Sequence, residues 1–393
     1  MNEPLRIAFV CDGIAEFTAG SVVSTRRFAL LLKARGHEIV FIAGKAPEHE
    51  HDDTWEGMKV YRFRSMLLPK TDERFYMGFP TTREATEVLT KEKTDILHVV
   101  VPTPAAISLV RAAKKLGIPV VVHSHTQPEN LFLNATHNKA DFIANVLSEI
   151  MYVYLRWLYK KVDLLIFPTE FSRNYFKGMP AHMRTEVVTN GVDINKFKPH
   201  DRGEVCKKLG LPEERQYLLY VGRLHPEKRV DTLIRAMPAI AKAHPQAHAL
   251  IVGGGHREAS LKALTKQVGA ESCVTFLGFL PEEDVQAVYS VSDIFVLPSL
   301  VELEGMVVLQ AIATGNALLI SDSTKSASRY LVDADGLLFK AGNPDDLAKQ
   351  ALTILNDPDM LAQFKAKSLS RRADFDINHS AERIEQIYYS LLH

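Results

Sequence analysis

Two carboxylates, a glycine and a buried amide stand close together in residues 292–315, SDIFVLPSLVELEGMVVLQAIATG. Glu302 and Glu304 separate a short apolar strand, which ends at Leu297, from an apolar run that has the character of a helix. The first amides of this helix belong to Gly305, Met306 and Val307. Free amides at a helix start bind anions, and a carboxylate such as Glu302 accepts hydrogen bonds from a polyol. The combination suits a sugar that carries a phosphate, whereas Glu304 fits the simpler role of serving the helix dipole.

Two cations follow another apolar strand. Arg223 and Lys228 flank the proline turn of RLHPEKRVD, directly after YLLYVG. Cations at a strand exit, just before a helix, suit a diphosphate, although a solvated helix start explains them equally well. The triple glycine Gly253–Gly255 after HALIV allows a backbone to approach a ligand closely, or serves as a flexible turn.

Other binding motifs are weak in this sequence. Asp333 and Asp335 form an Asp-x-Asp beside a glycine turn, and we interpret them as part of a solvated turn rather than a metal site. The sequence has no P-loop, and its glycines do not form the dinucleotide fingerprint with its downstream acid.

The residues above must be positioned by strands and helices that alternate in the same way in both halves of the chain. In the first half we expect strands at 5–12, 38–44, 96–102, 118–125 and 162–169, and helices at 24–36, 105–117 and 170–178. In the second half we expect strands at 217–223, 248–255, 274–280, 293–299, 317–322 and 336–342. Buried strands alternating with amphipathic helices predict an α/β protein with two Rossmann-like, doubly wound parallel sheets.

The chain of 393 residues is too long for one ordinary core. We predict an N-terminal domain at 1–188, a linker at 189–205 and a C-terminal domain at 206–376. Residues 377–393 should form a helix that packs back on the N-terminal domain.

Composition excludes several classes of protein. The 47 basic and 47 acidic residues balance, so a nucleic-acid partner is not indicated. Three well-separated cysteines indicate reduced thiols in a cytoplasmic protein. The start, MNEPLRIAFVCDG, is typical of a strand rather than a signal peptide, and we find no apolar run long enough to span a bilayer.

Taken together, the motifs resemble those of the retaining glycosyltransferases of the GT-B fold, in the large family 4-like group with an E-x7-E motif. The resemblance covers nearly the whole chain. In the second half it rests on YVGRLHPEKRVDTLIRAMP, LIVGGG, VTFLGFLPEEDVQAVYSVSDIFVLPS and ELEGMVVLQAIATG. In the first half it rests on AGSVVSTRRFALLLKARGHEI, PVVVHSHTQPEN, DLLIFPTEFSRNYF and VVTNGVDINKFKP. In such a fold the two domains face each other across a cleft.

The resemblance implies roles for individual residues. Arg223 and Lys228 would bind the donor diphosphate and stabilise the departing nucleotide, and Glu302 would hold the donor sugar's hydroxyls. His125 would reach toward the donor sugar, whereas His123 should point to the opposite face of the sheet and be structural. The other positions implied are Gly20 in the first glycine loop, Gly278 and Leu280 near the base, the helix start Gly305, Met306 and Val307, and Asn190 or Gly191 at the hinge.

The chain departs from the family pattern at one motif position. Gln310 stands where the second acid of the motif is expected. The resemblance implies sugar transfer with retention, by front-face displacement in which the leaving diphosphate takes the acceptor proton. We expect no metal and no cofactor, because Arg223, Lys228 and the helix amides would stabilise the leaving group.

The acceptor is predicted less directly. The segment 64–80, RSMLLPKTDERFYMGFP, together with HSHTQPEN at 123–130, resembles the branch that glycosylates diacylglycerol and related lipids. Residues 149–161, EIMYVYLRWLYKK, combine aromatic and basic side chains, which suits either contact with an anionic membrane or a core helix with a cationic edge. We therefore expect a nucleotide-sugar donor such as UDP-glucose, a lipid acceptor, and a protein that is cytoplasmic, at the inner face of the cell membrane.

Two alternatives remain at this point, and two further classes lack their motifs. A soluble sugar or small molecule is as plausible an acceptor as a lipid. Gln310 is compatible with a catalytically weak nucleotide-sugar-binding module, although Glu302, Arg223, Lys228 and His125 together favour an enzyme. A dehydrogenase would need the missing dinucleotide fingerprint, and a phosphorylase of this fold would need a pyridoxal lysine, for which we find no motif.

Overall fold

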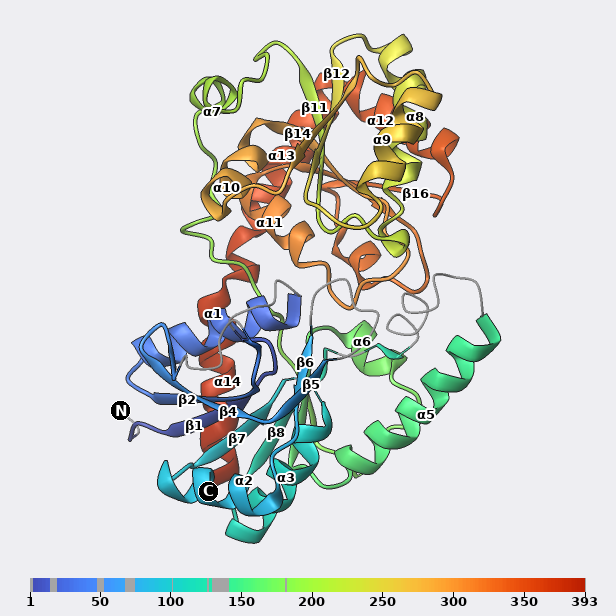
Figure 1. Cartoon of the computed structure of the whole chain (residues 1–393). Helices are drawn as coiled ribbons and strands as arrows, with labels where there is room; N and C mark the ends of the chain where they lie inside the picture. Colours follow the sequence, from blue (N-terminus) through green and yellow to red (C-terminus); the bar gives the residue numbers. More distant parts are fainter. Residues whose placement is uncertain are drawn as a thin grey trace. The chain divides into compact units, whose positions relative to one another are not determined.

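The structure is a computed structural model that describes residues 3–14, 20–47, 53–67, 75–100, 102–125, 127–128, 141–180 and 182–392. The chain divides into two compact units (Figure 1). The N-terminal unit comprises Met1–Asn190 and Asn378–His393, and the C-terminal unit comprises Gly191–Ile377. The change from one unit to the other, after Asn190, lies within the predicted linker.

The N-terminal unit contains, in its described residues, an eight-stranded sheet of order β10-β9-β8-β7-β1-β2-β4-β3. Its strands are β1 (Arg6–Val10), β2 (Glu38–Gly44), β3 (Thr54–Trp55), β4 (Met58–Phe63), β7 (Ile96–Val99), β8 (Val120–His123), β9 (Leu164–Phe167) and β10 (Thr185–Val187). All neighbours are parallel except β3 and β4. A separate antiparallel pair is formed by β5 (Ser65–Leu67) and β6 (Tyr76–Gly78). The central strands are buried, as expected for a sheet covered on both faces.

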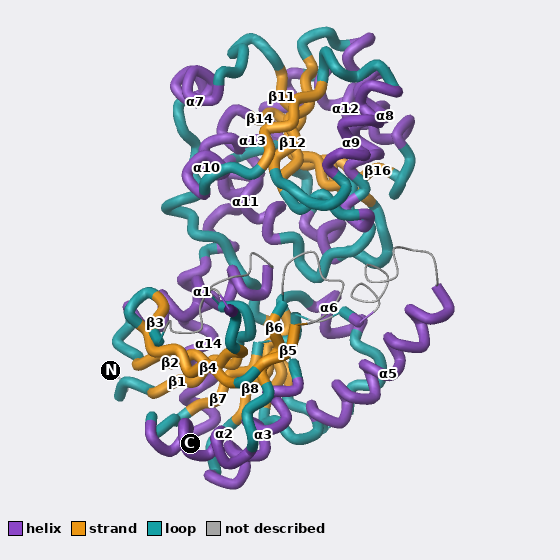
Figure 2. Tube along the Cα trace, viewed as in Figure 1, coloured by secondary structure: helices purple, strands orange, loops and turns teal. Residues whose placement is uncertain are grey.

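Helices flank this sheet (Figure 2). They are α1 (Gly20–Ala34), α2 (Thr82–Lys91), α3 (Pro104–Leu116), α5 (Asp141–Tyr159), α6 (Glu170–Tyr175) and most of α14 (Ile377–Leu392). The local sequence fixes their ends: α2 begins with a capping box between Thr81 and Glu84, and α3 ends at Gly117 in a left-handed conformation.

The C-terminal helix α14 is bonded to the N-terminal unit along its length. Glu385 pairs with both Arg35 and His37, at 2.6 and 2.9 Å. The buried hydroxyl of Tyr388 lies 2.5 Å from Nδ1 of His98 on β7. The end of the chain is therefore part of the fold that begins the chain.

The C-terminal unit contains a parallel six-stranded sheet of order β13-β12-β11-β14-β15-β16 among its described residues. The strands are β11 (Gln216–Val221), β12 (Ala247–Val252), β13 (Val274–Gly278), β14 (Ser292–Leu297), β15 (Ala317–Ser321) and β16 (Gly336–Phe339). The helices are α7 (Arg202–Leu209), α8 (Val230–Ala243), α9 (Glu258–Gln267), α10 (Glu282–Val291), α11 (Met306–Thr314), α12 (Pro344–Leu355) and α13 (Pro358–Arg371). Short 3₁₀ turns are η2 (Pro226–Lys228), η3 (Ala327–Leu331) and η4 (Arg372–Phe375).

The predicted class, two Rossmann-like parallel-sheet domains, is confirmed. Each strand predicted from an apolar run has a counterpart within a few residues of its predicted ends. The short strands β3 to β6 and β10 were not predicted, because they are two to six residues long and only partly buried. No helix in the described part of the chain has the length and apolar character needed to cross a membrane.

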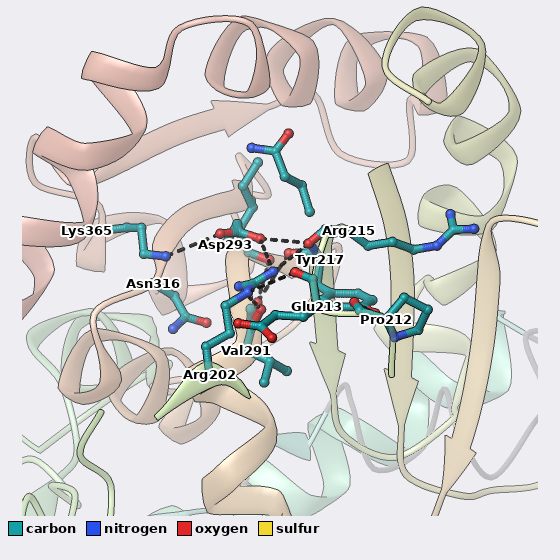
Figure 3. A network of polar contacts seen from close by, with 12 residues as sticks. Arg202, Pro212, Glu213, Arg215, Tyr217, Val291, Asp293, Asn316 and Lys365 are labelled. Atoms are coloured by element: carbon teal, nitrogen blue, oxygen red, sulfur yellow. Dashed lines mark hydrogen bonds and ion pairs between the residues drawn. The ribbon is translucent and has the colours of Figure 1, made fainter. Parts of the chain in front are cut away.

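A polar network pins the amino-terminal ends of β11 and β14 (Figure 3). The Asp293 carboxylate accepts hydrogen bonds from the amide of Tyr217 at 2.9 Å and from Arg202 at 3.4 Å, and Lys365 lies 3.3 Å away. Arg202 also donates to the carbonyls of Val291 and Arg215. Because ligands of parallel sheets bind at the opposite, carboxyl edge, we assign this network to stability.

Candidate functional site

The strand order reverses beside β11 in the C-terminal unit. The chain runs from β11 to β12 and β13 on one side, and then returns to β14 on the other side of β11. Open parallel sheets bind ligands at such a reversal, beyond the carboxyl ends of the strands. The loops that follow β11 and β14 are therefore the expected place for a site.

An ion pair joins these two loops. Lys228 ends the turn η2 after β11, and Glu302 follows β14; their Nζ and Oε1 atoms are 2.6 Å apart. Both side chains are largely buried, with 17% and 13% of their surface exposed. Sequence analysis predicted both residues as site residues, and the fold brings them into contact although they are 74 positions apart in the chain.

Backbone hydrogen bonds hold both loops in place around this pair. The amide of Leu300 donates to the carbonyl of Glu227 at 2.8 Å, which ties the loop after β14 to η2. The Glu302 carbonyl accepts from the amide of Ala327 at 2.8 Å, and the Tyr220 hydroxyl donates to the carbonyl of Arg223 at 2.8 Å. Lys228 and Glu302 are thus presented by braced backbone rather than by free loops.

Arg223 is exposed one residue beyond Gly222, where the chain leaves β11. The structure gives its guanidinium no partner among the described residues. An exposed cation in the same loop as Lys228 is available to an anion that arrives at this edge.

The triple glycine has a packing role. A Cβ atom on Gly255 would lie 2.8 Å from the carbonyl oxygen of Leu224, and one on Gly253 would overlap the Gly222 carbonyl. The Leu224 amide donates to the Gly254 carbonyl at 2.8 Å. The close approach that these glycines permit is therefore to the loop after β11, which they help to shape.

The start of α11 offers unpaired amides, as its position predicts. Gly305 precedes the helix in a left-handed conformation, with φ 92° and ψ 59°, and a side chain there would collide with Ser328. The Gly305 carbonyl accepts the first helical bond, from Val308 at 2.7 Å. The amides of Met306 and Val307 belong to the first turn, which has no intrahelical partners for its N–H groups. They lie on the helix that directly follows the Glu302 loop.

Gln310 lies in the middle of α11 and is buried. Its Oε1 accepts a hydrogen bond from the Tyr289 hydroxyl at 2.9 Å, and the same hydroxyl lies 3.2 Å from the carbonyl of Val307. Tyr289 is fully buried on α10. Sequence analysis missed Tyr289, because nothing in its local sequence distinguishes it from a core aromatic residue.

The loop after β13 carries the remaining residues predicted in this unit. Gly278 ends the strand with φ 68°, and its carbonyl accepts from the Gly253 amide at 2.7 Å. Leu280 is half-buried and packs against the hydrophobic core of the unit, and its predicted position near the base stays a prediction. Phe279 between them is 79% exposed, which is the largest such value for an aromatic residue of this unit's described part. Sequence analysis did not single it out.

The predicted Asp-x-Asp turn is only half solvated. Asp335 is fully buried and forms an ion pair with Arg371, whereas Asp333 is 64% exposed. The interpretation as a solvated turn is therefore wrong for Asp335, whose charge anchors α13. Among the described residues, no group of three or more His, Cys, Asp or Glu side chains is arranged to hold a metal ion.

In the N-terminal unit, His125 follows β8 and stacks on His123, with ring centroids 4.2 Å apart. The prediction that His123 faces the opposite side of the sheet is wrong, because side chains two residues apart in a strand share a face. His98 on β7 extends the stack, with its ring 5.8 Å from that of His123.

Burial lowers the pKa of all three histidines. It lowers the pKa of His98 to about 3 and that of His125 to about 4, and it holds the pKa of His123 well below its usual range. All three rings are therefore neutral near pH 7. His98 and its partner Tyr388 were not predicted, since they meet only through the folding of α14 against the sheet.

Three other predicted positions are Gly20 at the start of α1, and Asn190 and Gly191 where the chain leaves the N-terminal unit. Gly20 is the first residue of α1 and is exposed, and residues 15–19 of the predicted glycine loop lie outside the described residues. Asn190 is buried and accepts a hydrogen bond from Ser24 at 2.5 Å. Gly191 has φ 66°, and a Cβ atom there would lie 2.7 Å from Cα of Ile377. The roles predicted for these residues stay predictions.

The two segments predicted to bear on the acceptor are only partly described. Residues 68–74, 126 and 129–130 lie outside the described residues, and 65–67 and 76–78 form β5 and β6. In the segment 149–161, Tyr152 and Tyr159 are buried in the core and burial raises the pKa of Tyr159 to about 12. These two aromatic side chains therefore face the protein, as a core helix requires, whereas Trp157 is exposed; contact of this helix with a membrane stays a prediction.

Two family models match the chain. The model described as Glycosyl transferases group 1 matches residues 201–371, and the model described as Glycosyltransferase Family 4 matches residues 18–196.

Similar curated proteins include two that are named for lipid acceptors. One is the GDP-mannose-dependent monoacylated alpha-(1-6)-phosphatidylinositol monomannoside mannosyltransferase of Corynebacterium glutamicum, 27% identical over 90% of both chains. Another is the alpha-monoglucosyldiacylglycerol synthase of Streptococcus pneumoniae, 23% identical over 80% of this chain and 70% of that protein.

Similar solved structures cover nearly the whole chain. Sucrose-phosphate synthase from Thermosynechococcus elongatus has a TM-score of 0.78 at 19% identity and covers 98% of this chain and 99% of its own. HepE of Anabaena, solved with UDP and glucose, has a TM-score of 0.76 at 19% identity and covers 98% and 100%. At 19% identity, the similarity to these two structures shows that this chain has the same fold and nothing more.

Proposed function

The chain belongs to the family 4-like glycosyltransferases of the GT-B fold, and we propose that it transfers a hexose from a nucleotide diphosphate sugar to a hydroxyl group of a membrane lipid. The observation that carries the proposal is the Lys228–Glu302 pair at the strand-order reversal, beside exposed Arg223 and the start of α11.

In this proposal each residue at the carboxyl edge of the C-terminal sheet contacts one part of the donor. Arg223 and Lys228 neutralise the diphosphate, and the amides of Met306 and Val307 bind its oxygens. Glu302 accepts hydrogen bonds from the hydroxyls of the sugar. Gln310 holds the ribose through its amide, whose oxygen is oriented by Tyr289. His125, which burial keeps neutral, is the residue of the N-terminal unit for which the family resemblance implies contact with the donor sugar.

We propose a reaction with retention of the anomeric configuration. The bond between the anomeric carbon and the diphosphate oxygen breaks, and its electron pair leaves with the nucleotide. The acceptor oxygen attacks the same face of the sugar and its proton passes to the leaving diphosphate oxygen. Residue 310 is an amide and Glu302 is held by Lys228, so neither is suited to form a covalent intermediate.

Cationic side chains and helix amides are the proposed source of charge stabilisation, and the reaction is proposed to need no metal ion. Preorganised donors of this kind stabilise a leaving group without reorganisation during the reaction. The donor is proposed to be UDP-glucose or GDP-mannose. Similar proteins support both: one is named for GDP-mannose, and HepE was solved with UDP-glucose.

The lipid acceptor is supported by the similar proteins named for phosphatidylinositol mannoside and diacylglycerol. We place the enzyme at the cytoplasmic face of the cell membrane, where nucleotide sugars and such lipids meet. A soluble acceptor is the competing possibility, supported by the similarity in fold to sucrose-phosphate synthase.

The test is a transfer assay with labelled UDP-glucose and GDP-mannose, in parallel with diacylglycerol, phosphatidylinositol and soluble sugar acceptors. Label in the organic extract supports the proposal, whereas label only in soluble products contradicts the lipid acceptor. Glu302→Ala should lose transfer by orders of magnitude with its fold intact by circular dichroism, because this acid sets the reaction geometry. Near wild-type turnover in that variant would show the site to be wrongly assigned.

A further inference from the structure

The outward face of α5 is apolar. Five large apolar side chains on it are exposed: Phe142 (79%), Val146 (44%), Ile150 (60%), Val153 (60%) and Trp157 (38%). Their spacing of four, four, three and four residues places them on one stripe along the helix. Figure 1 shows α5 at the periphery of the N-terminal unit.

The opposite face of the same helix is also apolar, and it is buried. Tyr152, Leu155, Leu158 and Tyr159 belong to the core beneath the sheet. Packing in the core therefore explains why one face of α5 is apolar. It does not explain the apolar side chains of the exposed stripe. A continuous run of exposed apolar side chains on one helix is typical of an interaction surface.

Cations gather at the carboxyl end of the stripe. The Lys161 ammonium lies 5.0 Å from the centre of the Trp157 ring, and the Arg111 guanidinium on α3 lies 6.0 Å from it. Lys160 is also exposed. It lies three residues beyond Trp157, a spacing that makes two residues neighbours on a helix surface.

The nearby acids are already paired. The Asp163 carboxylate is 2.6 Å from Lys114, and Glu149 is 3.6 Å from Lys177. The charge that is left uncompensated around Trp157 is positive. A helix with a bulky apolar face, an aromatic residue near its end and lysines and arginines beside it is suited to lie in the plane of an anionic bilayer surface.

We propose that the stripe of α5, together with Arg111, Lys160 and Lys161, docks the protein on an anionic lipid bilayer. The apolar side chains enter the boundary between headgroups and acyl chains, and the cations bind the phosphates above it. The inference rests on the proposed lipid acceptor only in favouring a bilayer over a protein partner; the surface itself is observed independently of the reaction.

The experiment is sedimentation of the full-length protein with vesicles of phosphatidylcholine, with and without phosphatidylglycerol. Ile150→Ser/Val153→Ser should reduce partitioning onto anionic vesicles at least tenfold at both low and high salt, since the apolar term does not depend on salt. Lys160→Ser/Lys161→Ser should reduce it about fivefold for each cation at low salt and much less at 0.5 M salt.

Matched controls come from other faces of the molecule. Leu30→Ser removes an apolar side chain of comparable exposure, 41%, from α1, and Lys242→Ser removes an exposed lysine from α8. Neither should change partitioning. All variants should keep the wild-type melting temperature, because the replaced side chains are exposed.

Failure of the inference is distinguishable from failure of the proposed function. Wild-type sedimentation by the α5 variants, or no vesicle binding by the wild type, would overturn the docking surface even if lipid is glycosylated. A dimer that Ile150→Ser/Val153→Ser dissociates would also overturn it, in favour of a second copy of the chain. The expected vesicle binding, without transfer to any lipid, would support the surface and refute the proposed acceptor.

Discussion

The ion pair between Lys228 and Glu302 leads to a prediction about nucleotide binding. The Glu302 carboxylate lies 2.6 Å from the Lys228 ammonium, which is the group proposed to bind the diphosphate. A nucleotide diphosphate must therefore compete with Glu302 for Lys228. We expect Glu302→Gln to bind free UDP or GDP more tightly than the wild type, although its sugar transfer falls by orders of magnitude.

The size of the effect follows from the pair's chemistry. A hydrogen bond to a charged group contributes about 1.5–3 kcal/mol, and a charge-assisted bond is about twice as strong as a neutral one. Replacing the carboxylate by an amide should thus release about 1–1.5 kcal/mol for the ligand. Each 1.4 kcal/mol is a tenfold change in Kd, so we expect binding that is about five to ten times tighter.

The assay is calorimetric titration with whichever of UDP and GDP the wild type binds, at fixed ionic strength. The free nucleotide is used because it lacks the sugar that Glu302 is proposed to hold. Glu283→Gln is a matched control, since it removes one exposed carboxylate from the same unit without breaking this pair. It should change Kd by less than twofold.

A double-mutant cycle tests the cause. Lys228→Met should weaken binding, and in its background Glu302→Gln should lose most of its gain. A Glu302→Gln variant that binds the nucleotide equally well or more weakly would refute the competition. A full gain in the Lys228→Met background would attribute the effect to the general field of the carboxylate instead of the pair.

Three further predictions concern other groups of the two units. Gln310→Glu should retain transfer with an equal or lower donor KM, because the Tyr289 hydroxyl can donate to a carboxylate as it does to the amide. Tyr289→Phe should raise the donor KM more than it lowers kcat. Loss of transfer in Gln310→Glu would contradict the ribose assignment. EDTA should leave steady-state transfer unchanged, and Arg223→Ala should weaken binding of the nucleotide diphosphate; strict dependence on added magnesium or manganese would contradict the proposed charge stabilisation. The pKa of His98 is lowered from 6.5 to about 3 in the folded protein, so below pH 6.5 the unfolded chain binds a proton that the folded chain does not, and stability falls as pH falls toward 3. His98 should lower the free energy of unfolding by about 2 kcal/mol at pH 5. In urea denaturation, His98→Phe should therefore lose less unfolding free energy between pH 7 and pH 5 than the wild type does. An equal loss in both proteins would mean that other groups carry the pH dependence.

The sequence by itself determined most of the parallel strands, with β4 and β10 as exceptions, and most of the helices. Strands such as 247–252 are buried on both faces, so their apolar runs are continuous and need no tertiary information to be recognised. Helix ends were also local, since Gly305 and Gly117 adopt the left-handed conformation that ends or begins a helix. Residues at strand exits, among them Arg223, Lys228 and Glu302, could be selected because the carboxyl ends of parallel strands share one edge.

The contacts between those residues were decided by tertiary structure. Lys228 meets Glu302 because β14 lies beside β11, and a strand order is not written in either local segment. The same reason explains Tyr289 beside Gln310 and Tyr388 beside His98, which come from different helices and strands. One error was avoidable: the period of two along a strand places His123 and His125 on one face.

Tertiary structure also decided which side chains are buried where the local sequence allows two arrangements. The helix at 141–159 is apolar on both faces, and only packing shows that Tyr152 and Tyr159 enter the core while Ile150 and Val153 remain exposed. Asp335 looks like part of a solvated turn until α13 brings Arg371 against it. In each case the local sequence determines which side chains can be buried. Which of them are buried depends on the position of neighbouring helices and strands, and residues far away in the chain determine that position.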